Sequence, residues 1–144
     1  MGPLLFNRVD SCNCPQVLIV DDEELNRVVL SNMLKNLGYR FDTAINGHQA
    51  VEKVIERNES NCCSRYQLII MDYQMPEMSG PKATKFLTAK FSSGLLPLQP
   101  IIGHTAYDGG FEINTFRSSG VRDFLRKPVQ ADDLKQILDR WICE

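Results

Sequence analysis

The sequence lacks the features that would place the chain in a membrane or on nucleic acid. No apolar run approaches the ~20 residues that a spanning helix needs. The start MGPLLFNRVD has neither the charged region nor the apolar region of a secretion signal. Lys and Arg total 16 against 18 Asp and Glu, which leaves a net charge of -2 and no basic stripe for a phosphate backbone. We therefore expect a cytoplasmic domain without direct contact to nucleic acid or membrane.

Cysteine is present at five positions, an odd number in a chain without a secretion signal. Cys12 and Cys14 precede one apolar run, and Cys62 and Cys63 precede another. Neither pair has the C-x-x-C spacing of zinc knuckles. We expect reduced thiols. If the two runs form adjacent parallel strands, both pairs come to the sheet edge opposite the functional site, where a disulfide or a thiolate metal site is the alternative.

Apolar runs that suit buried strands alternate with helical patterns along the chain. Continuous runs at 17–20, 68–71 and 101–102 suggest strands covered on both faces, and weaker strands are expected over 39–45 and 121–125. Further helices are expected over 110–119 and 131–143. The other three predicted helices have the following apolar residues: Val28, Val29, Met33, Leu34 and Leu37; Ala50, Val51, Val54 and Ile55; and, after Pro81, Phe86 and Leu87.

This alternation favours a parallel sheet between helices, in which ligands bind beyond the carboxyl ends of the strands. Polar residues with useful chemistry occur at those ends. Asp21 and Asp22 follow the first strand, Asp72 the third and Thr105 the fourth, and Lys127 comes just after the fifth. A functional site is therefore expected where these residues meet.

The segments VLIVDDEELNR, LIIMDYQMPEMSG, IIGHTA and FLRKP, in this order, resemble the receiver (response-regulator) domain of two-component phosphorelays. The resemblance implies a flavodoxin-like α/β fold: one domain with a doubly wound parallel sheet of five strand–helix units in the strand order 2-1-3-4-5. Residues 16–143 are expected to form this domain, and residues 1–15 an N-terminal extension or linker.

Carboxylates held together at one sheet edge would repel one another unless a cation lay among them. Oxygen ligands alone favour Mg2+ or Mn2+ over zinc. The resemblance implies that Asp22 and Asp72 bind the ion directly and that Asp21 acts mostly through water. The backbone carbonyl of Gln74 is expected to complete the protein ligands.

The resemblance also makes Asp72 the phosphoacceptor, which takes a phosphoryl group from a phosphohistidine on a histidine kinase or a histidine phosphotransfer protein. Lys127 and the metal would supply positive charge, and the Thr105 hydroxyl would bind a phosphoryl oxygen. Phe124 would fill the space behind Thr105 after the hydroxyl moves. The output would be a two-state switch of the surface formed by the fourth helix, fifth strand and fifth helix, and not an enzymatic turnover.

One glutamine, one tyrosine and two histidines complete the set of predicted residues. Gln74 and Tyr107, two residues after Asp72 and Thr105, lie where the family tunes the access of water to the aspartyl phosphate. We expect the bulky Tyr107 to shield the phosphoryl group and so to slow hydrolysis of the aspartyl phosphate. His104 is expected to pack at the sheet end instead of donating a phosphoryl group, and His48 to be solvated at the start of a helix.

Rival functions remain open from the sequence. A haloacid-dehalogenase-type phosphatase also uses an aspartate and Mg2+ after a strand, but its second aspartate is replaced here by Gln74. A protein-binding module that works without phosphorylation usually lacks one of the acidic residues, the threonine or the lysine. All of these residues are present here. In a nucleotide-binding flavodoxin relative, the acidic stretch DDEE would repel phosphate. The chain could be a stand-alone regulator or a piece of a hybrid histidine kinase, which the motifs favour slightly.

Overall fold

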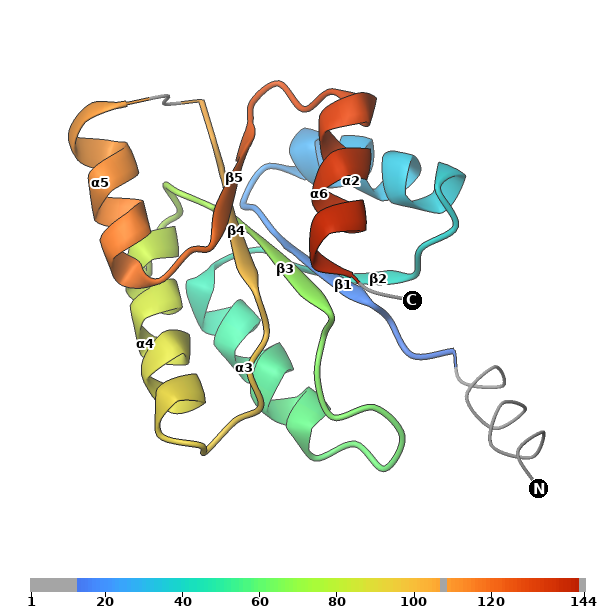
Figure 1. Ribbon diagram of the computed structural model, residues 1–144, viewed down its shortest axis with the longest axis vertical. Coiled ribbons are helices and arrows are strands. Elements are labelled where there is room, and N and C mark those ends of the chain that lie inside the picture. The colour runs from blue at the N-terminus through green and yellow to red at the C-terminus, as the bar shows by residue number, and fades with distance from the viewer. Residues whose placement is uncertain (1–12, 107–108, 143–144) are drawn as a thin grey trace.

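The computed structural model describes residues 13–106 and 109–142. Within them, strands and helices alternate along the whole chain (Figure 1). The elements are β1 (Val17–Val20), α2 (Glu24–Asn36), β2 (Phe41–Ala44), α3 (Gly47–Asn58), β3 (Leu68–Asp72), α4 (Gly80–Ser92), β4 (Ile101–Thr105), α5 (Gly110–Ser119), β5 (Asp123–Arg126) and α6 (Ala131–Trp141).

The five strands form one parallel sheet in the order β2-β1-β3-β4-β5, which confirms the predicted order. The register aligns the carboxyl ends of the central strands, because Val20 pairs with Met71 and Asp72 pairs with His104. Asp72 and Thr105 are the last residues of β3 and β4 instead of the first residues after them. The site residues therefore lie along one sheet edge.

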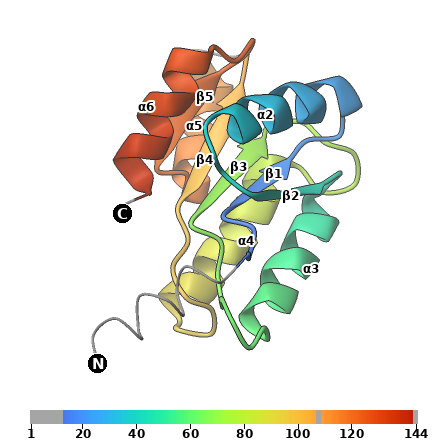
Figure 2. The same cartoon turned by 90° about the vertical axis from the view of Figure 1, so that its right-hand side faces the viewer.

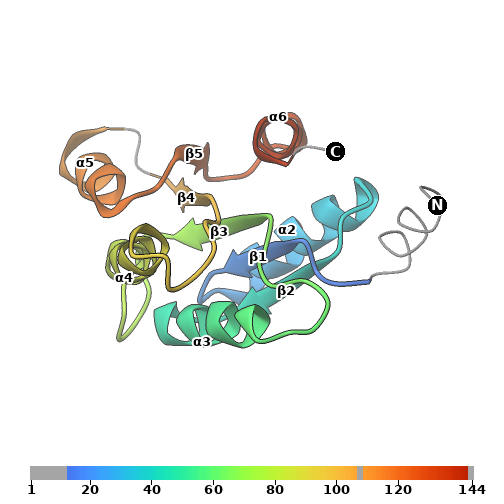
Figure 3. The same cartoon turned by 60° about the horizontal axis from the view of Figure 1, so that its bottom comes forward.

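Helices cover both faces of the sheet, as the continuous apolar strands predicted (Figure 2). On one face, Val17 and Ile19 of β1 pack in a cluster with residues of α2 and α6. On the other face, Leu18 and Val20 pack with residues of α3, α4 and α5. These three helices run along that face in succession (Figure 3). Within the described residues, no helix is both long and apolar enough to cross a bilayer.

Helix boundaries follow local capping chemistry. The Asn46 side chain accepts a hydrogen bond from the Gln49 N–H at the start of α3, and Ser79 accepts one from Lys82 N–H at the start of α4. Gly38, which follows the end of α2, has φ 89°, a conformation that glycine adopts without strain.

Three predicted core positions are wrong. Val28, Ile55 and Phe86 are exposed, by 46%, 40% and 41% respectively. In α2 the buried residues are Leu30 and Leu34, and a step of two residues turns a helix by about 200°, so Val28 lies on the opposite face. Apolar periodicity located each helix correctly but misjudged which members of a short apolar run faced the sheet.

Candidate functional site

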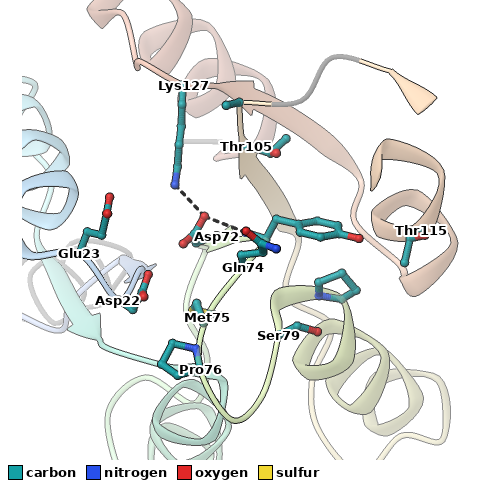
Figure 4. A pocket seen from close by; sticks show the side chains of 13 residues that line it. Asp22, Glu23, Asp72, Gln74, Met75, Pro76, Ser79, Thr105, Thr115 and Lys127 are labelled. Carbon is teal, nitrogen blue, oxygen red and sulfur yellow. Dashed lines mark hydrogen bonds and ion pairs between the residues drawn. The ribbon is translucent and has the colours of Figure 1, made fainter. Parts of the chain in front are cut away.

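The carboxyl ends of β1, β3, β4 and β5 border an open cleft of about 820 Å³. Figure 4 shows Lys127 reaching across this cleft towards Asp72, with Asp22 on the opposite wall. The cleft is lined by Asp22, Glu23, Asp72, Tyr73, Gln74, Met75, Pro76, Ser79, Pro81, Thr105, Ala106, Thr115 and Lys127. Sequence reasoning missed Met75, Ser79 and Thr115 because loops and helices, and not strand ends, bring them here.

Three aspartates converge at the cleft, as the sequence predicted. One carboxylate oxygen from each of Asp21, Asp22 and Asp72 lies within 4.8 Å of the other two. Asp21 is fully buried and Asp72 is 5% exposed, whereas Asp22 is exposed to solvent. Such an arrangement concentrates negative charge where water cannot fully screen it.

The first turn of α2 holds Asp21 in place. Asp21 Oδ1 accepts hydrogen bonds from the Glu23 N–H at 3.0 Å and from Asn26 Nδ2 at 3.4 Å. The Arg27 guanidinium donates to the Asp21 carbonyl at 2.8 Å. The sequence reading had missed Asn26 and Arg27. Their spacing of five and six residues from Asp21, across a strand-to-helix turn, was the available signal.

Lys127 supplies the positive charge predicted for the site. Its Nζ lies 2.7 Å from Asp72 Oδ1 and 3.5 Å from Asp21 Oδ2. The Lys127 N–H donates to the Thr105 carbonyl at 2.9 Å, and the Lys127–Pro128 peptide bond is cis. The lysine is thereby attached to the end of β4 and directed at both buried aspartates.

Burial dominates the ionisation of Asp72. Removal from water raises the pKa of its carboxyl to about 6, although the hydrogen bond from Lys127 acts in the opposite direction. The charge of Asp21 raises it further, and the Tyr73 N–H, 2.8 Å from Oδ1, lowers it. Burial also works against charge on Lys127, but its hydrogen bond and ion pair with Asp72 outweigh that effect and raise its pKa. The site therefore holds more negative charge than one ammonium stabilises.

His104 is buried at the sheet end, as predicted, with an exposure of 2%. Burial, followed by the charge of Lys127, lowers the pKa of the imidazole to about 4 although Asp21 acts to raise it. Its Nδ1 lies 4.0 Å from Asp21 Oδ2, and both ring nitrogens are buried without a hydrogen-bond partner within the described protein. The imidazole of His104 is therefore neutral and lies next to the Asp21 carboxylate. His48 is exposed near the start of α3, as expected.

An aromatic cluster connects the residue after Asp72 to the predicted switch residue. The ring of Tyr73 meets that of Phe116 edge-on at 5.2 Å, and Phe116 meets Phe124 at 6.1 Å. Phe124 is half-buried beside Gly103, where a Cβ would come within 3.1 Å of its ring. Thr105 is 3% exposed and borders the cleft. Sequence reasoning had not included Tyr73 and Phe116 in the switch, because their proximity depends on how α5 packs.

The loop after β3 brings its backbone close to Asp72. The Gly80 N–H donates to the Tyr73 carbonyl at 2.8 Å, and a Cβ at Gly80 would lie 1.9 Å from the Asp72 carbonyl oxygen. Gln74 is exposed and borders the cleft. Tyr107 lies outside the described residues, so the predicted role of its side chain stays a prediction.

The donors at this cleft fit a hard divalent cation. The three converging carboxylates provide only oxygen atoms, and Asp21 Oδ2 is buried without a hydrogen-bond partner among the described residues. Hard oxygen donors of this kind suit Mg2+ or Mn2+. Burial raises the pKa of Asp72 and the charge of Asp21 adds to this effect; a bound cation would offset that charge.

The fold and the site together define a flavodoxin-like domain with an acidic cleft at the carboxyl edge of its sheet. Residues 17–139 match the response regulator receiver domain family, and the chain belongs to this family. Curated relatives include hybrid histidine kinases and response regulators of two-component systems. One is hybrid signal transduction histidine kinase B of Dictyostelium discoideum, 36% identical over 83% of this chain. The chain spans only 6% of the length of that kinase.

Solved structures share the fold. The receiver domain of sensor histidine kinase PA1611 from Pseudomonas aeruginosa PAO1, described with a magnesium ion in its active site cleft, is 31% identical, with a TM-score of 0.72. The match covers 90% of this chain and 98% of that one. A second match is to a chain in the complex of the Saccharomyces cerevisiae phosphotransfer protein Ypd1 with the receiver domain of Ssk1. It has 27% identity and a TM-score of 0.74, and it covers 88% of this chain and 88% of the matched chain.

Proposed function

We propose that this receiver domain accepts a phosphoryl group on Asp72 from a phosphohistidine of a partner protein. The observation that carries the proposal is the meeting of three aspartate carboxylates with Lys127 Nζ, which lies 2.7 Å from Asp72 Oδ1. A structural aspartate at a strand end has no need of two further carboxylates and a lysine from two other strands.

In the proposed reaction, an Asp72 carboxylate oxygen attacks phosphorus while the bond from phosphorus to the histidine nitrogen breaks. The electron pair of the broken bond stays on that nitrogen. The donor histidine is released with a neutral imidazole ring after proton exchange with solvent. Lys127 and the Thr105 hydroxyl would bind phosphoryl oxygens, and positioning with charge neutralisation carries most of the catalysis in such transfers. The domain acts as a phosphoacceptor and a switch, in keeping with a family of receivers and not of enzymes.

Asp22, Asp72 and the Gln74 carbonyl would hold Mg2+, or Mn2+, directly, and Asp21 would act through water. When bound, the cation supplies positive charge that neutralises the carboxylates and the phosphoryl oxygens. The magnesium ion described for the PA1611 receiver supports this assignment. Asp21 also anchors the ammonium group of Lys127 at 3.5 Å.

The central test is incubation with acetyl phosphate and Mg2+, followed by intact mass spectrometry. We expect the mass to rise by one phosphoryl group in the wild type and in the control Asp139→Asn, which changes an exposed aspartate on α6. Asp72→Asn and added EDTA should abolish the adduct. No adduct on the wild type with any small donor would instead favour a binding module that works without phosphorylation.

The phosphodonor is proposed to dock beside the cleft, on the first turns of α2. Leu25 and Val28 lie one turn apart there and are 72% and 46% exposed, close in sequence to Asp22 and Glu23, which line the cleft. Exposed apolar residues next to a reactive site mark a partner surface. Leu25→Ser should slow transfer from a phosphorylated histidine protein and leave labelling by acetyl phosphate unchanged. Equal slowing with both donors would refute docking at this position.

Phosphorylation is proposed to change the surface of α5, β5 and α6, the fourth helix, fifth strand and fifth helix of the prediction. Movement of Thr105 towards the phosphoryl group would let Phe124 turn inwards. The contact from Phe116 to Tyr73 connects this change with the loop after Asp72. A downstream protein would read the altered surface, in the cytoplasm and without nucleic acid or membrane contact by this domain.

Gln74 and Tyr107 are proposed to tune the lifetime of the aspartyl phosphate. A bulky tyrosine near the phosphoryl group would limit the approach of water. Tyr107→Ala should therefore speed dephosphorylation of the purified protein, measured as decay of the phosphorylated mass. An unchanged rate would contradict this role.

A further inference from the structure

A cluster of thiols lies at the end of the sheet opposite the acidic cleft. Cys14 precedes β1, and Cys62 and Cys63 lie in the connection from α3 to β3, so all three are near the amino ends of neighbouring strands (Figure 1). Their Sγ atoms lie within 4.8 Å of one another, and those of Cys62 and Cys63 are 3.7 Å apart. The expected meeting of the two cysteine segments at this edge of the sheet is therefore confirmed for these three. Cys12 and Cys143 lie outside the described residues.

The two segments that carry these cysteines are tied together by a buried arginine. Arg57, which is 9% exposed, donates from Nε to the Cys63 carbonyl at 2.9 Å and from its terminal nitrogen to the Pro15 carbonyl. Arg40 also donates from Nε to the Cys14 carbonyl at 3.1 Å. Because the backbone is held on both sides, only side-chain rotation is needed to bring the sulfur atoms closer.

The arginine is itself fixed by packing. The Arg57 guanidinium stacks on the ring of Tyr66 at 4.5 Å, and the Tyr66 hydroxyl donates to Asp42 at 2.7 Å. Tyr66 is 2% exposed and belongs to the core cluster on the α3 side of the sheet. The backbone beside the thiol cluster is thus anchored to the core through Arg57 and Tyr66, which lowers the entropy cost of binding a ligand there.

From this geometry we infer that Cys14, Cys62 and Cys63 bind a zinc ion. Thiolates are soft ligands that select zinc over magnesium. With Zn–S bonds of about 2.3 Å, the sulfur atoms of a tetrahedral site are about 3.8 Å apart. The sulfur atoms of Cys62 and Cys63, 3.7 Å apart, already have this spacing. The Cys14 sulfur lies within 4.8 Å of both and needs to approach by at most about 1 Å.

Binding converts the three thiols to thiolates and releases three protons. Cys62 is exposed, whereas Cys14 and Cys63 are half-buried, so an ion can reach the three sulfur atoms from solvent. The ion would join the approach to β1 to the α3–β3 connection, and its binding to the folded chain would stabilise that chain by mass action.

The test uses the full chain, reduced and stripped of metal, with millimolar Mg2+ present to occupy the carboxylate cleft. We expect one equivalent of Zn2+ to be retained against a chromophoric chelator. Cd2+ should give the ultraviolet thiolate-to-metal charge-transfer absorption that carboxylates do not produce. Cys14→Ser, Cys62→Ser and Cys63→Ser should each weaken Zn2+ binding at least tenfold and remove that absorption.

Matched controls separate loss of the site from loss of the fold. Asp139→Asn, which changes an exposed residue of α6, should retain both the zinc and the absorption, and each variant should still be labelled by acetyl phosphate as the wild type is. The inference would be overturned by any of three results: no zinc retention by the reduced wild type, retention that the three substitutions leave unchanged, or a disulfide among these cysteines in protein purified without oxidant.

Discussion

The Asp72 carboxylate is ionised in the folded protein at a cost in stability, and this cost can be measured. Its pKa of about 6 in the fold exceeds the ordinary 3.8 because burial and Asp21 outweigh the help from Lys127. Between these values the folded state binds more protons than the unfolded state, so this group stabilises the fold below pH 3.8, and that contribution is lost as the pH rises through 6.

Asp72→Asn keeps the shape of the side chain and a hydrogen-bond acceptor for Lys127, but it removes the charge. Each pKa unit corresponds to about 1.36 kcal/mol, so without metal the variant should be more stable than the wild type by about 3 kcal/mol at pH 8. At pH 5 the carboxyl is mostly protonated in the folded protein, and the difference should fall to roughly half of that value. Added Mg2+ should narrow the difference at pH 8, because it binds the wild-type carboxylates.

The assay is urea unfolding in EDTA at both pH values, followed by the fluorescence of Trp141, the only tryptophan in the sequence. Its indole N–H donates to Asp123 at 3.0 Å, so unfolding changes its environment. Asp139→Asn removes an exposed charge and should change stability by no more than about 0.5 kcal/mol at either pH. An Asp72→Asn variant no more stable than wild type at pH 8, or a difference that does not shrink by pH 5, would refute this account.

Further predictions concern the frame around the site. Gly80→Ser should destabilise the fold by about 2 kcal/mol or more, because its Cβ would lie 1.9 Å from the Asp72 carbonyl oxygen, whereas Gly109→Ser, with nothing within 4 Å, should be nearly neutral in thermal unfolding. Asn46→Ala should cost about 1 kcal/mol in urea unfolding, because it removes the cap of α3; an unchanged midpoint would contradict the capping role. His104→Leu should leave stability unchanged or raise it by about 1 kcal/mol, because both imidazole nitrogens are buried without a partner in the described protein. A clear loss of stability would instead reveal a buried water bonded to the ring.

Much of this protein could be predicted from its sequence. The continuous apolar runs predicted a sheet covered on both faces, because strands buried on both sides cannot alternate polar and apolar residues. The aspartates, threonine and lysine could be placed at one edge because parallel strands end together. The strand order followed only from the resemblance, since periodicity does not specify which strands are neighbours.

Other features depended on packing that no local pattern encodes. Val28 and Phe86 belong to apolar runs, and only the angle at which α2 and α4 lie on the sheet decides that these residues face solvent. The contact of Phe116 with Tyr73 and Phe124 joins residues far apart in the chain.

The sequence by itself determined the alternating elements, the two-sided core and the set of residues at the acidic cleft, because these depend on composition and on short-range order. Tertiary structure alone decided the energetic state of that cleft. The raised pKa of Asp72 arises from burial and from Asp21, which is 51 residues away in the chain. The meeting of Cys14 with Cys62 and Cys63 was likewise decided by β1 and β3 pairing side by side, since spacing along the chain carries no information about that distance.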